Sequence, residues 1–197
     1  MNNDKNNNDL FGCDFRNDLY DKIAYILTYP NEDFFVISSS IKTLLEESNF
    51  DTKDSFDNFY SQTKERSIGE IQELYTTTFE LNAKFSLNIG SHIFKDDIKK
   101  RSMFMSRIRE ALIRYGVEEK TELPDFLPFI LRLSTKIDEI NSLEPLLTEC
   151  LIDPISEIIK QFEDNKNPYN NLLKTVLKIL QYDFKKIKTV ELEDSLC

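Results

Sequence analysis

The sequence predicts an all-α fold, a single domain built as a multi-helix bundle. Apolar residues recur at spacings of three, four or seven along most of the chain, and the period-two alternation of β-strands is hard to find. Only four glycines and six prolines interrupt the 197 residues. A chain of this length suits one domain with a substantial core. We expect the helical domain at 14–190, a disordered tail at 1–13 and a short tail at 191–197.

The first half of the chain contains four predicted helices, each with an apolar stripe. They are expected at about 16–28, 32–47, 54–64 and 68–81. Pro30 follows the end of the first helix, and Ser67 with Glu70 has the spacing of a capping box that opens the fourth. The apolar pattern then continues through 85–93, which is consistent with a separate helix.

The second half supplies a series of cap and stop signals. These are Asp96 or Asp97, Gly116, Ser142, Asp153-Pro154 and Asn167-Pro168. Helices are therefore expected at 98–115, at about 124–140, and from positions 143, 154 and 168 onward. The total is nine or ten helices in one bundle.

Charge and hydropathy restrict the kind of partner. The net charge is −10, from 35 acidic and 25 basic residues. This balance argues against general nucleic-acid binding, and it suits either a basic partner or solubility alone. A basic run at 99–101, with Arg107 and Arg109 beyond it, either attracts an anion or forms the solvated face of a helix. No stretch approaches the roughly 20 apolar residues of a membrane helix, and no secretion signal is evident, so we expect a cytoplasmic protein without membrane insertion.

The residues that catalysis usually requires are scarce. His92 is the only histidine, so a histidine metal cluster is impossible, and its apolar neighbourhood favours a hydrogen-bonded structural role. Cys13, Cys150 and Cys197 lie too far apart for a zinc-binding pattern, and Cys150 is expected in the core. The glycines do not cluster into a phosphate-binding loop. We therefore expect no enzymatic activity, no cofactor and no metal.

Two segments resemble a known family. The stretch 75–80, Tyr-Thr-Thr-Thr-Phe-Glu, is similar to the Tyr-x-x-Thr-Phe-Asp of the nitrate reductase delta-subunit chaperones. These are NarJ-like molybdenum-cofactor assembly proteins within the TorD-like group. The stretch 122–128, Glu-Leu-Pro-Asp-Phe-Leu-Pro, resembles the family's Glu-Leu-Pro-Asp-His-Leu-Pro. Smaller similarities are Ser86-Leu87, His92, Lys100-Arg101-Ser102-Met103 and Tyr115-Gly116.

The resemblance covers about a third of the chain, residues 70–134, and it has departures. Phe126 stands where the family has a histidine, Ser102 replaces a glycine, and Arg132 lies where a glutamate is expected. These departures leave open any role for a histidine in this loop and the identity of the recognised peptide.

The resemblance implies a TorD-like architecture and a chaperone rather than an enzyme. Such proteins bind the N-terminal segment of a molybdoenzyme catalytic subunit, for example a nitrate reductase, and hold it until the molybdenum cofactor is inserted. The candidate peptide-binding residues are Phe79, Glu80, Glu122, Pro124, Asp125, Phe126 and Phe129. Their aromatic rings would contact the apolar side of a basic amphipathic segment, and their carboxylates would meet its charges.

Several alternatives remain at this point. Phe79 and Phe129 suit core packing equally well, and Asp125 equally suits the cap of the helix that follows. A helical adaptor that binds another amphipathic helix is a rival function, and so is a metal-dependent hydrolase that uses carboxylates and His92. The protein is expected to be a monomer or a homodimer.

Overall fold

Ten α-helices and three shorter helical turns form the part of the chain that the computed structural model describes, residues 13–48, 52–118, 121–162 and 166–194. The α-helices are α1 (Cys13–Ile26), α2 (Phe34–Glu47), α3 (Lys53–Thr63), α4 (Ile68–Tyr75), α5 (Gly90–Phe94), α6 (Ile98–Arg114), α7 (Leu127–Ser134), α8 (Ile140–Leu147), α9 (Asp153–Lys160) and α10 (Pro168–Asp194). The shorter turns are η1 (Thr76–Glu80), η2 (Ala83–Phe85) and η3 (Thr148–Ile152). These ranges hold no β-strand, and the predicted all-α single-domain bundle is confirmed.

Several helix ends lie where the sequence placed them. Ser67 and Glu70 form the expected capping box, with the Ser67 N–H donating to the Glu70 carboxylate at 2.8 Å. Asp97 caps α6 by accepting a hydrogen bond from the Lys100 backbone N–H at 3.0 Å. Gly116 has a φ of 66°, the left-handed value that glycine adopts most easily, and ends this helix. Local interactions therefore fixed these boundaries.

The expected helix at 85–93 is right only for its last residues, which lie in α5. After η2 the chain is not helical at 86–88, and Asn88 pairs with Phe126 in the segment before α7. The Ile89 N–H donates to the Asp125 carbonyl at 2.9 Å, and the Leu127 N–H donates to the Leu87 carbonyl at 2.8 Å. Leu87 and Ile89 are both buried, and Ile89 already has helical backbone angles as the N-cap residue of α5.

The predicted helix at 124–140 is shorter than expected, because α7 begins only at Leu127, after Asp125 and Phe126 have joined this pairing, and it ends at Ser134. Ser142 is not a cap, since α8 begins two residues earlier and the Ser142 hydroxyl donates to the Glu139 carboxylate at 2.9 Å. Asp153 is not a cap either, because α8, η3 and α9 follow one another without a break. Because α8, η3 and α9 form one continuous helical rod, the ten α-helices of the described chain amount to about nine separate rods.

The first and last helices of the described chain reach into the segments that were predicted as tails. Helix α1 begins at Cys13, and residues 1–12 of the expected N-terminal tail lie outside the described residues. Helix α10 continues to Asp194, so 191–194 are helical rather than part of a tail, and 195–197 lie outside the described residues. Pro168 is the first residue of α10, and the Asn167 side chain accepts from the Tyr169 N–H at 3.0 Å, as its cap spacing predicts.

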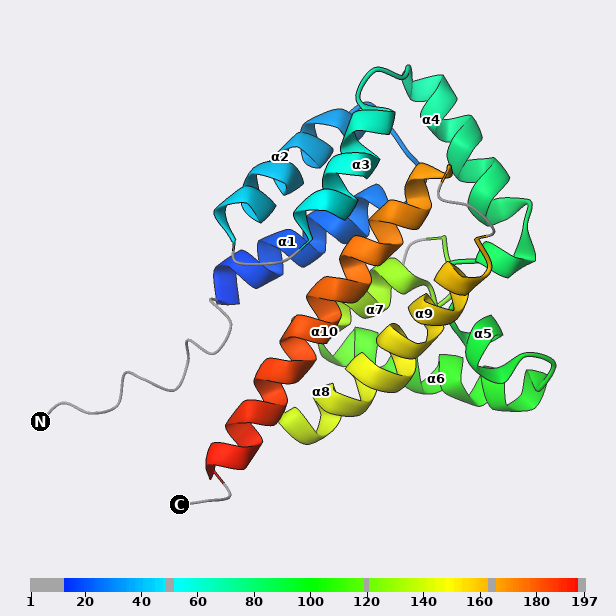
Figure 1. Ribbon diagram of the computed structural model, residues 1–197. Coiled ribbons are helices and arrows are strands. Elements are labelled where there is room, and N and C mark those ends of the chain that lie inside the picture. The colour runs from blue at the N-terminus through cyan, green and yellow to red at the C-terminus, as the bar shows by residue number, and fades with distance from the viewer. Residues whose placement is uncertain (1–12, 49–51, 119–120, 163–165, 195–197) are drawn as a thin grey trace, which may run out of the picture.

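Helix α10 crosses the front of the molecule and packs on α3, α8, η3 and α9 (Figure 1). Helix α1 packs between α2 and α7. Helix α4 lies at the upper right of this view, and α5 and α6 lie at the lower right. Within the described residues no helix is both long and apolar enough to cross a membrane.

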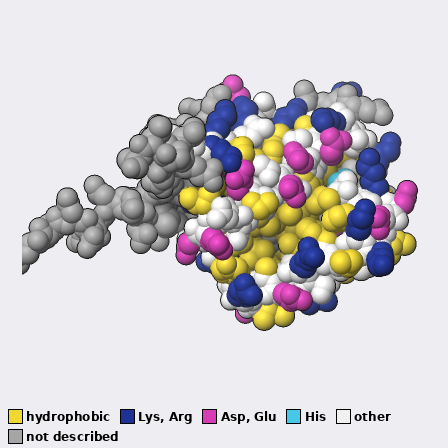
Figure 2. Space-filling view, turned by 90° about the horizontal axis from the view of Figure 1, so that it is seen from below, with side chains coloured by type: hydrophobic (Ala, Val, Ile, Leu, Met, Phe, Trp, Pro, Cys, Tyr) yellow, Lys and Arg dark blue, Asp and Glu magenta, His cyan; other side chains and the backbone are white. Residues whose placement is uncertain are grey.

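The lower side of the bundle is formed largely by α6 and α8. Helix α6 packs on α5 and α7, and α8 and η3 also pack on α7. Figure 2 views the molecule from this side and shows hydrophobic side chains gathered in the middle, with charged side chains around them.

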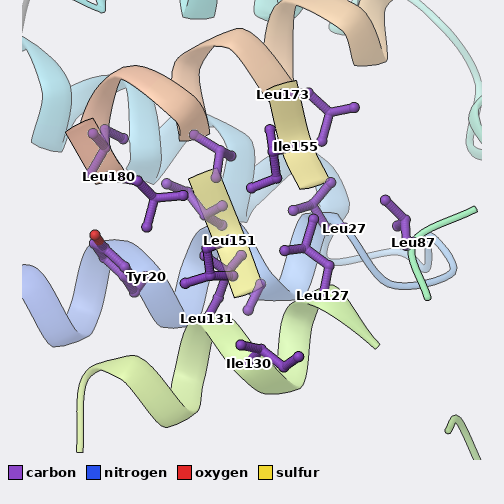
Figure 3. Packing of buried hydrophobic residues seen from close by; sticks show 14 of the residues in the cluster. Tyr20, Leu27, Leu87, Leu127, Ile130, Leu131, Leu151, Ile155, Leu173 and Leu180 are labelled. Carbon is purple, nitrogen blue, oxygen red and sulfur yellow. The ribbon is translucent and has the colours of Figure 1, made fainter. Parts of the chain in front are cut away.

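The core lies where α1, α7, η3 and α10 meet (Figure 3). Leu151 of η3 is fully buried in the centre of this view, between Leu180 of α10 and Leu131 of α7. Tyr20 of α1 closes one end of the cluster, and Ile155 of α9 extends it toward Leu173. Burying such side chains contributes about 1.5–3 kcal/mol each, so this cluster holds α1, α7, η3 and α10 together.

A buried polar cluster joins the same helices. The Asp183 carboxylate on α10 accepts from the Arg16 guanidinium and from the Tyr20 hydroxyl on α1, both at 2.7 Å. Arg16 also donates to the Ser134 carbonyl at the end of α7 at 3.4 Å. Removing Asp183 would take away the acceptor that the buried Arg16 guanidinium and the Tyr20 hydroxyl share, so the cluster constrains how the three helices meet.

Candidate functional site

The two segments that resemble a known family meet at one pocket of about 550 Å³. Four of the seven candidate residues line it, namely Phe79, Glu80, Glu122 and Phe126. The rest of the lining is Tyr75, Leu81, Ala83, Ser86, Leu87, Asn88, Ser91, Arg101 and Leu123. The fold therefore brings together motif residues that are far apart in the sequence.

The π-helical turn η1 sets the first wall. It places Phe79 inward, at 6% exposure, while the next residue, Glu80, is exposed. The Phe79 ring packs edge-to-face on Tyr75 at 5.2 Å and on Tyr169 at 4.8 Å between centroids. The Thr76 hydroxyl donates to the Glu80 carboxylate at 2.7 Å and orients it. Phe79 is thus a core residue whose edge also lines the pocket, so both of its predicted roles are compatible.

The second wall comes from the pairing between 86–89 and 125–127. This pairing places Leu87 and Phe126, both buried, on the pocket lining. The Phe126 ring packs edge-to-face on Phe129 at 5.5 Å. Phe129 and Pro124 are buried and do not line the pocket, and Phe129 supports Phe126 through this ring contact.

Asp125 is fully buried and does not line the pocket. Its Oδ2 accepts from Nε and from a terminal nitrogen of Arg101, each at 3.0 Å. It does not cap α7, because Phe126 occupies the N-cap position. Gly90 permits this pair, since a Cβ at that position would lie 2.5 Å from Asp125 Oδ2. Asp125 therefore holds the guanidinium of Arg101, and Arg101 is the member of this pair that lines the pocket.

The polar groups of the pocket are mainly acceptors. Glu80 and Glu122 are exposed carboxylates on the lining, and Asn88 Oδ1 is buried without a hydrogen-bond partner among the described residues. Burial raises the pKa of the Tyr75 hydroxyl, and the charges of Glu122 and Glu80 raise it further. This arrangement suits a ligand that brings apolar groups together with hydrogen-bond donors or positive charge.

His92 lies outside this pocket. Its Nε2 donates to the Ser86 carbonyl at 2.8 Å, which confirms the expected structural hydrogen bond. The ring lines a smaller pocket of about 280 Å³ with Glu149, Asp153 and Glu157. In the described part of the chain, no three side chains of His, Cys, Asp or Glu are grouped so that they could hold a metal ion.

The sequence reasoning missed some of the lining. Tyr75, Leu87 and Arg101 belong to the segments that carry the resemblance, so their positions in those motifs could have identified them as pocket residues. Asn88 and Ser91 had no such signal, because the non-helical path of 86–88 and the start of α5 beside it bring them to the pocket.

No protein-family model matches this chain, and no curated protein matches it either. The resemblance therefore rests on the motif residues themselves.

Proposed function

We propose that this protein is a cytoplasmic assembly chaperone of TorD-like architecture for a molybdoenzyme, a nitrate reductase or a close relative. It binds the N-terminal segment of the catalytic subunit and holds it until the molybdenum cofactor is inserted. One observation carries the proposal. The segments at 75–80 and 122–128, which resemble that chaperone family, line the same pocket.

The chemistry of the pocket suits such a peptide. Its volume of about 550 Å³ lies within the range of pockets that enclose ligand groups. Phe79, Leu87 and Phe126 offer an apolar surface to the hydrophobic side chains of an amphipathic segment. Glu80 and Glu122 lie where they can pair with its basic residues. The net charge of −10 would speed the encounter with a basic peptide by electrostatic steering.

The test is calorimetric titration with a peptide of the first thirty or so residues of the molybdoenzyme catalytic subunit from the same organism. We expect a Kd of about 1 μM or lower, typical of specific recognition. Glu122→Lys and Leu123→Asp alter exposed residues of the lining, so each is expected to weaken binding about tenfold or more while the fold is kept.

Matched controls are available on α2, which does not contribute to the pocket. Glu47→Lys repeats the charge reversal and Val36→Asp repeats the apolar-to-acidic change, both at exposed positions. Both are expected to bind like the wild type. Asp125→Ala is a poorer probe, because it strands the partly buried Arg101 and so mixes loss of binding with loss of stability.

Binding that survives both pocket variants would place the peptide elsewhere on the protein. Absence of heat at two temperatures, with a correctly folded protein, would refute the chaperone proposal. The adaptor alternative, which binds a different amphipathic helix, would then be pursued by unbiased pull-down.

A further inference from the structure

Helix α6 turns one face to the bundle and leaves the rest of its surface exposed. It lies at the lower right of Figure 1 and packs on α5 and α7. Among its 17 residues only Ile108 and Leu112 are buried. At about 100° per residue, the exposed positions cover roughly 200° of the helix circumference. These positions are Ile98, Lys99, Lys100, Ser102, Met103, Ser106, Arg107, Arg109, Glu110, Ile113 and Arg114.

This outer face of α6 is basic, although the whole chain has a net charge of −10. Five of its exposed residues are Lys or Arg and one is acidic. Lys100 forms an ion pair with Asp97 at 3.2 Å. Lys99, Arg107 and Arg114 form no ion pair with any residue that the structure describes. The face therefore offers cations that are not neutralised within the described protein.

Three large apolar side chains lie among these charges. Ile98 is 77% exposed, Ile113 is 73% exposed and Met103 is 52% exposed. Figure 2 looks onto the lower side of the molecule, where Lys and Arg side chains alternate with hydrophobic ones. Met103 follows Ile98 by five residues and Ile113 follows Met103 by ten, whereas a partner helix needs apolar residues at steps of three or four. The face thus interleaves basic and apolar residues and lacks the continuous stripe of a helix-packing surface.

We propose that the outer face of α6 docks on a bilayer surface rich in anionic phospholipid. The Lys and Arg side chains pair with the lipid phosphates, and the Ile and Met side chains enter the boundary between headgroups and acyl chains. A nucleic acid would also attract the charges, but single strands are held by stacking on aromatic side chains. None of the exposed residues of α6 is aromatic. A lipid surface satisfies both the basic and the aliphatic side chains of this face.

Neither the acidity of the chain nor the peptide pocket conflicts with this docking. The Debye length is about 8 Å at physiological salt, and a domain of 197 residues is roughly 40 Å across. Acidic groups on the far side of the molecule are therefore screened from the bilayer. Arg101 lines the pocket, and its side chain points about 160° away from that of Lys99 around the helix. Peptide and lipid would thus contact different sides of α6.

The test is co-sedimentation of the full chain with vesicles of phosphatidylcholine and phosphatidylglycerol, against vesicles of phosphatidylcholine alone. We expect binding to the anionic vesicles only, and less of it when salt rises to about 1 M, where the Debye length is about 3 Å. The basic variant, Arg107→Glu with Arg114→Glu, is expected to lower the partition coefficient about 100-fold. The apolar variant, Ile98→Gln with Ile113→Gln, is expected to lower it about tenfold. All four positions are exposed, so the helical circular dichroism should stay unchanged.

Matched controls lie away from α6. Lys64→Glu with Arg66→Glu makes the same change of net charge at exposed positions in the turn between α3 and α4, at the top of Figure 1. Val36→Gln removes an apolar side chain that is 70% exposed on α2. Both controls are expected to bind vesicles like the wild type. The two α6 variants should still bind the peptide in calorimetry, so the lipid proposal and the chaperone proposal can fail independently.

A wild type that stays in the supernatant with anionic vesicles at low salt would overturn the proposal. Vesicle binding that neither α6 variant weakens would overturn it too, because the lipid contact would then lie elsewhere. If only the basic variant lost binding, the aliphatic side chains would not enter the bilayer. That result would replace the lipid surface with another polyanion, an acidic protein or a nucleic acid.

Discussion

Gly90 is the position where one added methyl group should have the clearest effect. The glycine begins α5 and does not have a positive φ, so its backbone suits alanine. A steric clash opposes the substitution, because an alanine Cβ would lie 2.5 Å from Asp125 Oδ2 and 3.3 Å from Arg101 Cγ. Asp125 is fully buried and cannot move toward solvent, so its hydrogen bonds to Arg101 must give way.

The magnitude follows from competing effects. Overpacking of a filled site costs about 1–3 kcal/mol, and a weakened hydrogen bond to a charged group costs about 1.5–3 kcal/mol. The lower entropy of the unfolded chain with alanine returns about 0.4–1 kcal/mol. We therefore expect Gly90→Ala to lower the free energy of unfolding by about 2–4 kcal/mol, which lowers the urea midpoint by about 1 M.

Gly69 supplies the matched control. It lies in α4 and is exposed, and no heavy atom lies within 4 Å of the position that an alanine Cβ would take. Gly69→Ala is therefore expected to raise the free energy of unfolding by about 0.4–1 kcal/mol. Urea unfolding followed by circular dichroism measures both variants under the same conditions.

A second comparison isolates the cause. In an Asp125→Ala background the carboxylate that obstructs the Cβ is gone, so Gly90→Ala is expected to cost less than about 1 kcal/mol there. The steric reasoning would be refuted if Gly90→Ala were as stable as the wild type. It would also be refuted if the full cost persisted in the Asp125→Ala background.

Further predictions concern buried polar groups. Tyr169→Phe is expected to leave the free energy of unfolding unchanged or raise it by up to about 1 kcal/mol, because its buried hydroxyl lacks a partner among the described residues. Tyr75→Phe is the contrast and should lose about 0.5–1.5 kcal/mol, since its hydroxyl donates to a buried carbonyl; equal effects in urea unfolding would contradict this. Burial raises the pKa of Tyr20, Tyr75 and Tyr169, so the unfolded chain releases phenol protons near pH 10 that the folded chain keeps. Stability should therefore fall as pH rises above about 10, and a urea midpoint that is constant from pH 8 to 10.5 would exclude this. Asp183→Ala should cost about 3–5 kcal/mol, because it removes the carboxylate that neutralises a buried guanidinium, and a near-wild-type melting temperature would argue against that role. Burial raises the pKa of the Cys150 thiol to about 12, so without the other two cysteines it should alkylate about 100-fold more slowly at pH 8 in the folded protein than in urea, a difference that mass spectrometry can follow.

Motif positions predicted part of the pocket but not its geometry. Phe79, Glu80, Glu122 and Phe126 line the pocket, and the resemblance of their segments to one family predicts them. The same resemblance predicts Asp125, yet only the fold shows that this residue is buried and pairs with Arg101. The spacing of residues along the chain does not say which of them face a common space.

The sequence by itself determined the helical class and those helix ends that depend on neighbours within one turn. The capping box at Ser67 and the glycine stop at Gly116 involve residues no more than a few positions apart, so their signals are local. The tertiary structure alone decided the non-helical path of 86–88 and the unbroken rod from α8 to α9. Both depend on which distant segment lies alongside, and that choice is set by hydrogen bonds and packing summed over the whole bundle rather than by local preference.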